Sequence, residues 1–220
     1  GDAKETVKKL NAKLNNSVSL EQLESVKNAV IEIKRKIDAN LTKSEKRHKK
    51  LLTILRKIAP SETIFSTDAC QLSYTGVFDF NISKARKWLH PVGFCALGNA
   101  LPNAIGVKMA LPMTPVAVLV GDGGFMFSMP ELLTAKEQNL SLPIIIWENG
   151  GYKQIQDDMG VKKINRVGVE GLNPDFVKLA EACHCISVYA DNEELFVDAF
   201  KKASFNNSPT IIAVSYTHLR

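Results

Sequence analysis

Several short stretches of this chain are apolar at consecutive positions, and this pattern limits the fold more than any other feature. They read VAVLVG at 116–121, PIIIWE at 143–148 and PTIIAV at 209–214. A strand with one face in water alternates apolar and polar residues, whereas a strand covered on both faces need not. Together with ETIFST at 62–67 and HCISVY at 184–189, these stretches predict the strands of a parallel sheet.

Helix-length segments separate the predicted strands. The sequence predicts helices within residues 98–111, 129–139, 173–183 and 192–204. Strands and helices that alternate along a chain are typical of an α/β fold, in which helices flank a parallel sheet. We therefore expect the region from about residue 60 onward to be an α/β domain.

Two further helices are predicted before the first strand. Residues 19–37 place apolar side chains on one helical face, with Ser19 as the N-cap. That face consists of Leu20, Leu23, Val26, Val30, Ile33 and Ile37. A second helix is expected over 44–60, with Ser44 as a possible cap and Pro60 beyond its end.

Charge is distributed unevenly along the chain, whose formal net charge is +5. Residues 1–60 hold 15 of the 28 Lys and Arg residues but only 7 of the 23 Asp and Glu residues. The excess is greatest in KSEKRHKK at 43–50, which is either the solvated face of a helix or a patch for nucleic acid or acidic membrane. Because no aromatic residues interrupt it and no nucleic-acid motif is present, we expect no nucleic-acid or membrane partner.

The rest of the sequence bears on whether the protein is secreted or spans a membrane, and on whether it has a zinc site. No segment has the length and composition of a signal-peptide core or a membrane span, which favours a cytoplasmic protein with reduced cysteines. Cys183-His184-Cys185 is either a buried strand edge or part of a zinc site, although no further ligands at suitable spacing are evident.

Glycine-rich turns with one polar residue follow two of the predicted strands. They read GDGG at 121–124 and ENGG at 148–151. Ligands of parallel sheets sit beyond the carboxyl ends of the strands, and glycines allow backbone N–H groups to approach a phosphate closely. Asp122 would repel a phosphate unless a divalent cation bridged them, and Mg²⁺ prefers oxygen ligands such as those of Asp122 and Asn149.

The two turns therefore predict a shared diphosphate–metal site, with ordinary turn residues as the alternative. A dinucleotide-binding G-x-G-x-x-G would need a third glycine where Met126 stands, and no lysine completes a Walker pattern. Asp122 and Asn149 are expected to be surface turn residues whose replacement leaves the fold largely intact.

These residues carry a family resemblance. GDGGF, followed 27 residues after its Asp by the Asn of ENGGY, resembles the thiamine-diphosphate-binding motif. The segment at 66–112, from STDACQLSYTG to KMALP, resembles the part that precedes this motif in the acetolactate-synthase-like family. NPDFVKLAEACHCISV and SPTIIAV resemble its closing strands, and GDAKETVKKL resembles the last helix of that family's middle domain.

The resemblance implies the cofactors thiamine diphosphate and Mg²⁺ and a role for individual residues. Mg²⁺ would be bound by Asp122, the Asn149 side chain and the backbone carbonyl of Gly151. Leu97 would support the bent cofactor from beneath, and carbonyls near Cys95 would hold its aminopyrimidine. The implied cofactor-binding set is Gln71, Cys95, Leu97, Gly121, Gly123, Gly124, Asn149, Gly151 and Tyr152. Glu148 departs from the family, which usually has an asparagine there.

The resemblance also implies a domain organisation. Residues 1–15 would be a remnant of the middle domain, 16–43 a helical linker, and 44–214 the diphosphate-binding C-terminal domain of the thiamine-diphosphate-binding fold. Residues 215–220 match no family pattern and are expected to be a non-native tail. The activating glutamate belongs to a pyrimidine-binding domain that these residues do not contain, so no catalytic residue is assigned.

The implied enzyme decarboxylates a 2-oxo acid and either releases an aldehyde or transfers the activated fragment to a second 2-oxo acid. It would act as a homodimer or tetramer, while these residues alone would be inactive. The alternative is a non-catalytic degenerate domain or a basic nucleic-acid-binding module. Stabilisation by the cofactor would favour the enzyme, and salt-dependent binding to DNA or RNA would favour the binding module.

Overall fold

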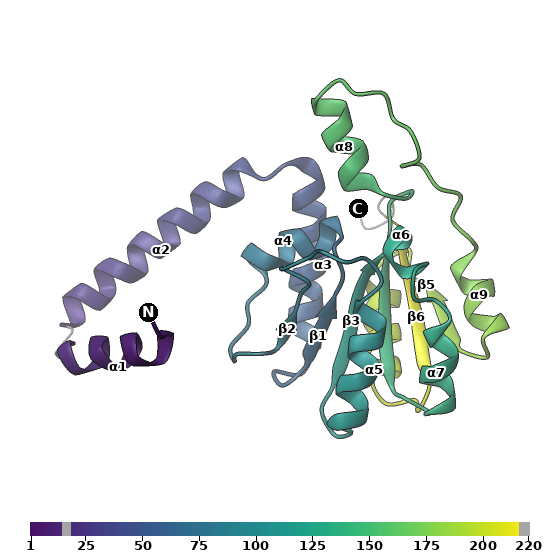
Figure 1. Ribbon diagram of the computed structural model, residues 1–220, viewed down its shortest axis with the longest axis horizontal. Helices are drawn as coiled ribbons and strands as arrows, with labels where there is room; N and C mark the ends of the chain where they lie inside the picture. Colours follow the sequence, from purple (N-terminus) through teal and green to yellow (C-terminus); the bar gives the residue numbers. More distant parts are fainter. Residues whose placement is uncertain (15–18, 216–220) are drawn as a thin grey trace. The chain divides into compact units, whose positions relative to one another are not determined.

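The computed structural model describes residues 1–14 and 19–215, which fall into two compact units (Figure 1). The units are Gly1–Thr42 and Lys43–Arg220. The expected roles of 1–15 and 16–43 as domain remnant and linker stay predictions. Of the expected non-native tail, only Ser215 is described, and it is the last residue of a strand; the other five residues lie outside the described part of the chain.

The first unit contains helices α1 (Ala3–Lys13) and α2 (Leu20–Asn40). Ser19 caps α2 as predicted: its side chain accepts the Gln22 N–H, and the Gln22 side chain accepts the Ser19 N–H in return. The apolar face predicted for α2 is exposed, from 42% at Ile37 to 85% at Leu20. None of the residues of α1 or α2 is buried in this unit.

The second unit is built on a parallel sheet of six strands, which confirms the predicted fold class. The strand order is β2-β1-β3-β4-β6-β5. The strands are β1 (Ile64–Thr67), β2 (Trp88–Leu89), β3 (Val116–Gly121), β4 (Leu142–Glu148), β5 (Ile186–Tyr189) and β6 (Pro209–Ser215). The two-residue edge strand β2 was not predicted, because so short a stretch carries no periodic signal.

Helices cover both faces of this sheet (Figure 1). They are α3 (Lys43–Ile58), α4 (Gln71–Asp79), α5 (Ala100–Ala110), α6 (Asp122–Phe125), α7 (Glu131–Glu137), α8 (Lys153–Val161), α9 (Phe176–Ala182) and α10 (Glu193–Ala203). The prediction of Ser44 as a cap is wrong, because α3 already begins at Lys43. The helices α4 and α8 were not predicted, and α6 is a single turn.

Neighbouring residues of each central strand enter different cores, which explains the unbroken apolar runs. In β3, Leu119 packs with Leu51 of α3 and Phe200 of α10 in one core. Val118 and Val120 belong to the core on the other face, with residues of α5, α7 and α9. Burying both faces removes the need for polar residues at alternate positions.

The basic segment 43–50 lies on α3 but is not a uniform basic surface. His48 is only 2% exposed and faces the core, and Lys49 pairs with Asp79 at 3.0 Å. The His48 ring meets the Trp147 ring edge-on with centroids 5.1 Å apart. Its Nδ1 lies 2.9 Å from Thr75 Oγ1, which is also 3.2 Å from the Gln71 carbonyl oxygen.

We expect His48 to make the folded state sensitive to mild acid. Burial lowers the pKa of His48 from 6.5 to about 4, although the nearby Glu45 charge acts in the opposite direction. Between these values the unfolded chain binds more protons, so stability is complete above pH 6.5 and falls as the pH drops toward 4. The free energy of unfolding should decrease by roughly 2 kcal/mol between pH 7 and pH 5.

Urea denaturation followed by tryptophan fluorescence checks this expectation. The His48→Gln variant serves as the comparison, since glutamine is polar but does not titrate. Between pH 7 and pH 5, the unfolding free energy of this variant should fall by about 2 kcal/mol less than that of the unmodified chain. Identical pH dependence in the two proteins would contradict the prediction.

Candidate functional site

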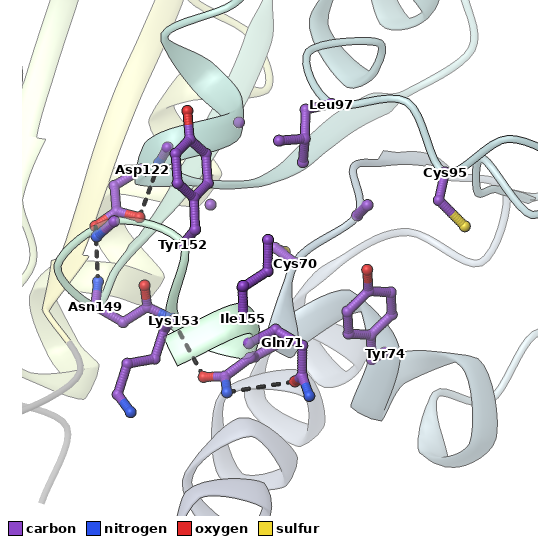
Figure 2. A pocket seen from close by; sticks show the side chains of 16 residues that line it. Cys70, Gln71, Tyr74, Cys95, Leu97, Asp122, Asn149, Tyr152, Lys153 and Ile155 are labelled. Carbon is purple, nitrogen blue, oxygen red and sulfur yellow. Dashed lines mark hydrogen bonds between the residues drawn. The ribbon is translucent and has the colours of Figure 1, made fainter. Parts of the chain in front are cut away.

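One cavity of about 230 Å³ lies at the carboxyl ends of the central strands (Figure 2). It contains all ten residues that the sequence assigned to the cofactor and the metal. The lining residues are Ala69, Cys70, Gln71, Tyr74, Cys95, Leu97, Gly121, Asp122, Gly123, Gly124, Asn149, Gly151, Tyr152, Lys153, Gln154 and Ile155. Residues more than 80 positions apart in the sequence therefore share one site.

The Asp122 carboxylate is the most heavily hydrogen-bonded group in this cavity. Its Oδ2 accepts the backbone N–H groups of Asn149 at 3.0 Å, Gly150 at 2.7 Å and Gly151 at 3.1 Å. It also accepts the Asn173 side-chain amide at 2.7 Å, while Oδ1 accepts the Gly123 N–H at 2.8 Å. Oδ2 thus accepts four hydrogen bonds, whereas Oδ1 accepts one.

The expectation that Asp122 is a surface turn residue is therefore wrong. Only 1% of it is exposed, because the turn after β4 folds over its carboxylate. A short polar residue between glycines is typical of an exposed turn, and the sequence gives no sign that the next turn covers it. Asn149 is half-buried.

The Asn149 side chain is oriented by a residue from another part of the chain. Its Nδ2 donates to Gln71 Oε1 at 3.3 Å, and its oxygen points away from Gln71 (Figure 2). Gln71 in turn donates to Asp157 Oδ2 at 2.9 Å. Burial alone would raise the pKa of Asp157, but hydrogen bonds from Lys153 and Gln71 outweigh it and lower that pKa.

The glycines of the first turn have no room for side chains. A Cβ on Gly123 would lie 2.9 Å from the Tyr152 ring, and one on Gly124 would lie 2.3 Å from Asp68 Oδ2. Gly121 is less tightly enclosed, since a Cβ there would lie 3.0 Å from the Cβ of Cys70. The backbone of this turn therefore forms part of the cavity wall directly.

Leu97 and Cys95 reach the cavity from the loop before α5. Leu97 is half-buried, whereas Cys95 is exposed and has a φ of 57°. Gly98, the residue after Leu97, has a φ of 82° and is buried. Its N–H donates to Asp68 Oδ2 at 2.8 Å, which fixes the loop to the end of β1.

Several residues at this site were not predicted from the sequence. Asn173 bonds directly to Asp122, and its position before Pro174 gave no sign of a role at the cavity. Tyr74, Lys153 and Gln154 line the wall formed by α4 and α8, the two helices that were not predicted. Asp68 lies behind the wall and follows β1 directly, where a polar residue at a strand end would have been a usable signal.

The residues of the cavity fit a hard cation. Asp122 offers a carboxylate, Asn149 an amide oxygen, and Gly151 a carbonyl that accepts one hydrogen bond from Lys153 N–H at 2.9 Å. These are ligand types of Mg²⁺ rather than of zinc. Within residues 1–14 and 19–215, no group of three or more His, Cys, Asp or Glu residues could hold a metal, so Cys183-His184-Cys185 forms no such zinc site there. Cys183 and Cys185 are both buried.

Known proteins are similar to this chain over the region that forms the cavity. Residues 69–214 match the family model described as "Thiamine pyrophosphate enzyme, C-terminal TPP binding domain". The chain is 42% identical over 139 residues to the probable 2-ketoarginine decarboxylase AruI of Pseudomonas aeruginosa, covering 63% of this chain and 25% of the relative. It is 29% identical over 216 residues to the acetolactate synthase large subunit of Buchnera aphidicola subsp. Schizaphis graminum, covering 94% of this chain and 38% of the relative.

Solved structures are similar over the same region. The thiamine diphosphate-dependent 4-hydroxybenzoylformate decarboxylase of Rhodococcus jostii RHA1 gives a TM-score of 0.71 at 27% identity, covering 79% of this chain and 33% of that chain. A benzoylformate decarboxylase from Polynucleobacter necessarius gives a TM-score of 0.69 at 20% identity, over 76% and 32% of the two chains, and supports the fold alone. The chain thus spans well under half of the length of these relatives. No described helix is long and apolar enough to cross a membrane.

Asp122 should matter for stability as well as for ligands. Asp122→Ala removes a buried carboxylate that accepts four backbone N–H groups and one side-chain amide, and we expect the free energy of unfolding to fall by about 2–3 kcal/mol. Asn149→Ala is the matched comparison, because it removes one longer side-chain bond and should cost less than about 1 kcal/mol.

Urea denaturation without added metal or cofactor measures both variants against the unmodified chain. Equal stability of Asp122→Ala and the unmodified chain would show that the hydrogen bonds around this carboxylate contribute nothing to the fold. A large loss of unfolding free energy in Asn149→Ala would instead show that the Asn149 side-chain amide makes the stabilising contact.

Proposed function

Because this chain belongs to the thiamine pyrophosphate enzymes and carries their C-terminal TPP-binding domain, we propose that its cavity binds Mg²⁺ and the diphosphate of that cofactor. The main observation in support of this proposal is that Asp122 and Asn149 lie next to each other. Gly121, directly before Asp122, is paired in the sheet with Trp147, which lies two residues before Asn149, and Asp122 Oδ2 accepts the Asn149 N–H at 3.0 Å. A carboxylate and an amide oxygen are thereby brought to one edge of the sheet, where ligands of parallel sheets bind.

Each part of the cavity has a proposed task. Asp122, Asn149 and the Gly151 carbonyl hold the cation, and the Gly123–Gly124 backbone lies against the diphosphate. Gln71 Oε1 accepts a hydrogen bond from the Asn149 amide nitrogen, and this directs the Asn149 amide oxygen away from Gln71. Gln71 also lines the cavity itself, within reach of the diphosphate.

The other end of the cavity is assigned to the thiamine portion. Leu97 supports it from beneath, and the backbone near Cys95 holds its aminopyrimidine. When bound, thiamine diphosphate supplies the electron sink for decarboxylation, and the protein supplies binding and orientation. At about 230 Å³ the cavity is smaller than the roughly 300–1,000 Å³ of most cofactor pockets, so we propose that a further protein surface completes it.

The proposed reaction is decarboxylation of a 2-oxo acid. Two of the relatives named above are decarboxylases, one of a guanidino 2-oxo acid and one of an aromatic 2-oxo acid, and another is an acetolactate synthase. The substrate side chain and the acceptor of the activated fragment therefore differ among these relatives. An acetolactate-synthase-like 2-oxo acid enzyme that acts as a homodimer or tetramer is the proposal that covers these relatives. A partner subunit would then provide the surface that completes the cavity, together with the activating glutamate.

Binding of thiamine diphosphate should depend on Mg²⁺ and on Asn149. We expect the unmodified chain to bind the cofactor in titration calorimetry with Mg²⁺ and to lose measurable binding when a chelator removes the cation. Asn149→Ala should weaken binding by about tenfold or more, since one metal ligand is lost. Asn103→Ala, an exposed asparagine on α5 outside the cavity, should bind like the unmodified chain.

Unchanged cofactor affinity in Asn149→Ala would remove this residue from the metal site. Binding that is equally tight with and without the chelator would contradict the role of Mg²⁺. Asp122→Ala is less suitable for this test, because its loss of stability would lower the affinity indirectly.

These 220 residues alone should release no carbon dioxide from 2-oxo acids at ordinary enzyme rates. The diphosphate end of the site is present, but the proposed activating glutamate is not assigned to any residue of the chain. The assay supplies saturating Mg²⁺ and thiamine diphosphate with pyruvate, a longer aliphatic 2-oxo acid and a guanidino 2-oxo acid. Turnover of about 1 s⁻¹ or more by the chain would show that it contains a complete catalytic site.

A further inference from the structure

A buried carboxyl group that the proposed function does not use lies directly behind the cavity. Asp68 follows β1, and its N–H donates to the Leu119 carbonyl of β3 at 2.9 Å, which fixes its backbone to the sheet. None of its surface is exposed. Burying a carboxyl group costs free energy unless hydrogen bonds or nearby charges offset the cost.

One oxygen of Asp68 connects two segments of the cavity wall. Its Oδ2 accepts the Gly98 N–H at 2.8 Å. The same oxygen lies 2.3 Å from the position that a Cβ on Gly124 would occupy, so it touches the backbone of the GDGG turn. Leu97 Cδ2 lies 3.7 Å from that same Cβ position. Gly98 and Gly124 therefore both lie against this carboxyl oxygen, and the Leu97 side chain lies beside Gly124.

The loop that carries Leu97 has few other ways to keep its place. Gly98 has a φ of 82°, a conformation that other residues adopt only with strain, and a Cβ there would lie 2.5 Å from Phe127 Cβ. The preceding residues 92–96 are all exposed. The hydrogen bond from Gly98 to Asp68 is thus the contact that ties this exposed loop to the sheet at the residue next to Leu97.

The second oxygen of Asp68 is buried as well, and no donor among the described residues reaches it with hydrogen-bond geometry. Burial raises the pKa of Asp68, while the backbone N–H groups of Gly98, Ala69 and Asn99 and the nearby His90 act in the opposite direction. A group kept for folding alone would more often be fully paired or replaced by an apolar side chain. Its retention next to Leu97 and Gly124 points to a task in the cavity.

We propose that Asp68 is a positioning residue that holds Leu97 at the correct height beneath the thiamine portion of the cofactor, by fixing the Leu97–Gly98 backbone against the GDGG turn. The proposal rests on the proposed function, because it gives Leu97 a cofactor to support. It assigns Asp68 no contact with the diphosphate. Loss of its hydrogen bond should therefore affect the two ends of the cofactor differently.

The test compares two ligands, thiamine diphosphate and inorganic pyrophosphate, each with saturating Mg²⁺, in titration calorimetry on the 220-residue chain. In Asp68→Leu the side chain keeps a similar shape but accepts no hydrogen bond. The affinity for thiamine diphosphate should fall roughly tenfold in this variant, while the affinity for pyrophosphate should change by less than about twofold. Leu97→Ala should show the same selective loss. Asp68→Asn keeps an acceptor for the Gly98 N–H and should bind both ligands nearly like the unmodified chain.

Equal weakening of both ligands in Asp68→Leu would overturn the proposal, because a general disturbance of the fold lowers both affinities. Unchanged thiamine diphosphate affinity in Asp68→Leu, with a loss in Leu97→Ala, would also overturn it. If the unmodified chain bound pyrophosphate but not thiamine diphosphate, this inference would fail while the metal–diphosphate site remained. Binding of neither ligand would overturn the proposed function itself.

Amide hydrogen exchange provides a measurement that does not depend on the folding of Asp68→Leu. In the unmodified chain and in Asp68→Asn, the Gly98 N–H should exchange slowly although residues 92–96 are exposed. Exchange of Gly98 as fast as that of its exposed neighbours would show that Asp68 does not hold the loop, and would overturn the proposal whatever the variants do.

Discussion

The site depends on one carboxylate that accepts hydrogen bonds from the neighbouring turn. Asp122 Oδ2 takes up the N–H groups of three consecutive residues, Asn149 to Gly151, at 2.7–3.1 Å. This arrangement orders the ENGG turn, which has to bend sharply through two glycines with φ values of 88° and 104°. Without the carboxylate, these three N–H groups would lose their acceptor, and the backbone from which the Asn149 side chain extends would no longer be fixed.

The packing of the sheet makes this contact possible. Because β3 and β4 are parallel and adjacent, their carboxyl ends emerge at the same edge with Gly121 opposite Trp147. Both faces are covered by apolar cores, so the edge is the place where polar groups can be gathered without being buried in hydrocarbon. Asp68 at the end of β1 extends the same arrangement to the next strand, since β1 and β3 are also paired.

Elements with a strong local sequence pattern were predicted correctly, and elements without one were not. The β3 stretch matches its predicted bounds, and Ser19 is the N-cap that was predicted; its capping box with Gln22 was not predicted. The apolar face of α2 is also present as a pattern, but it is exposed in its unit, because periodicity records a face and not what covers it. The helix α4 begins at Gln71 without a side-chain cap and has weak amphipathicity, and the two residues of β2 are too few for a period.

The α/β class and the two turns that carry Asp122 and Asn149 could be predicted from local patterns, because buried strands and glycine turns leave local signatures. The burial of Asp122, its hydrogen bond from Asn173 and the orientation of Asn149 by Gln71 arise only in the folded chain. The same is true of the contact between Asp68 and Gly98, which lie 30 residues apart. These contacts join strand ends and loops that are distant in sequence, and a hydrogen bond formed by chain topology has no periodicity from which it could be predicted.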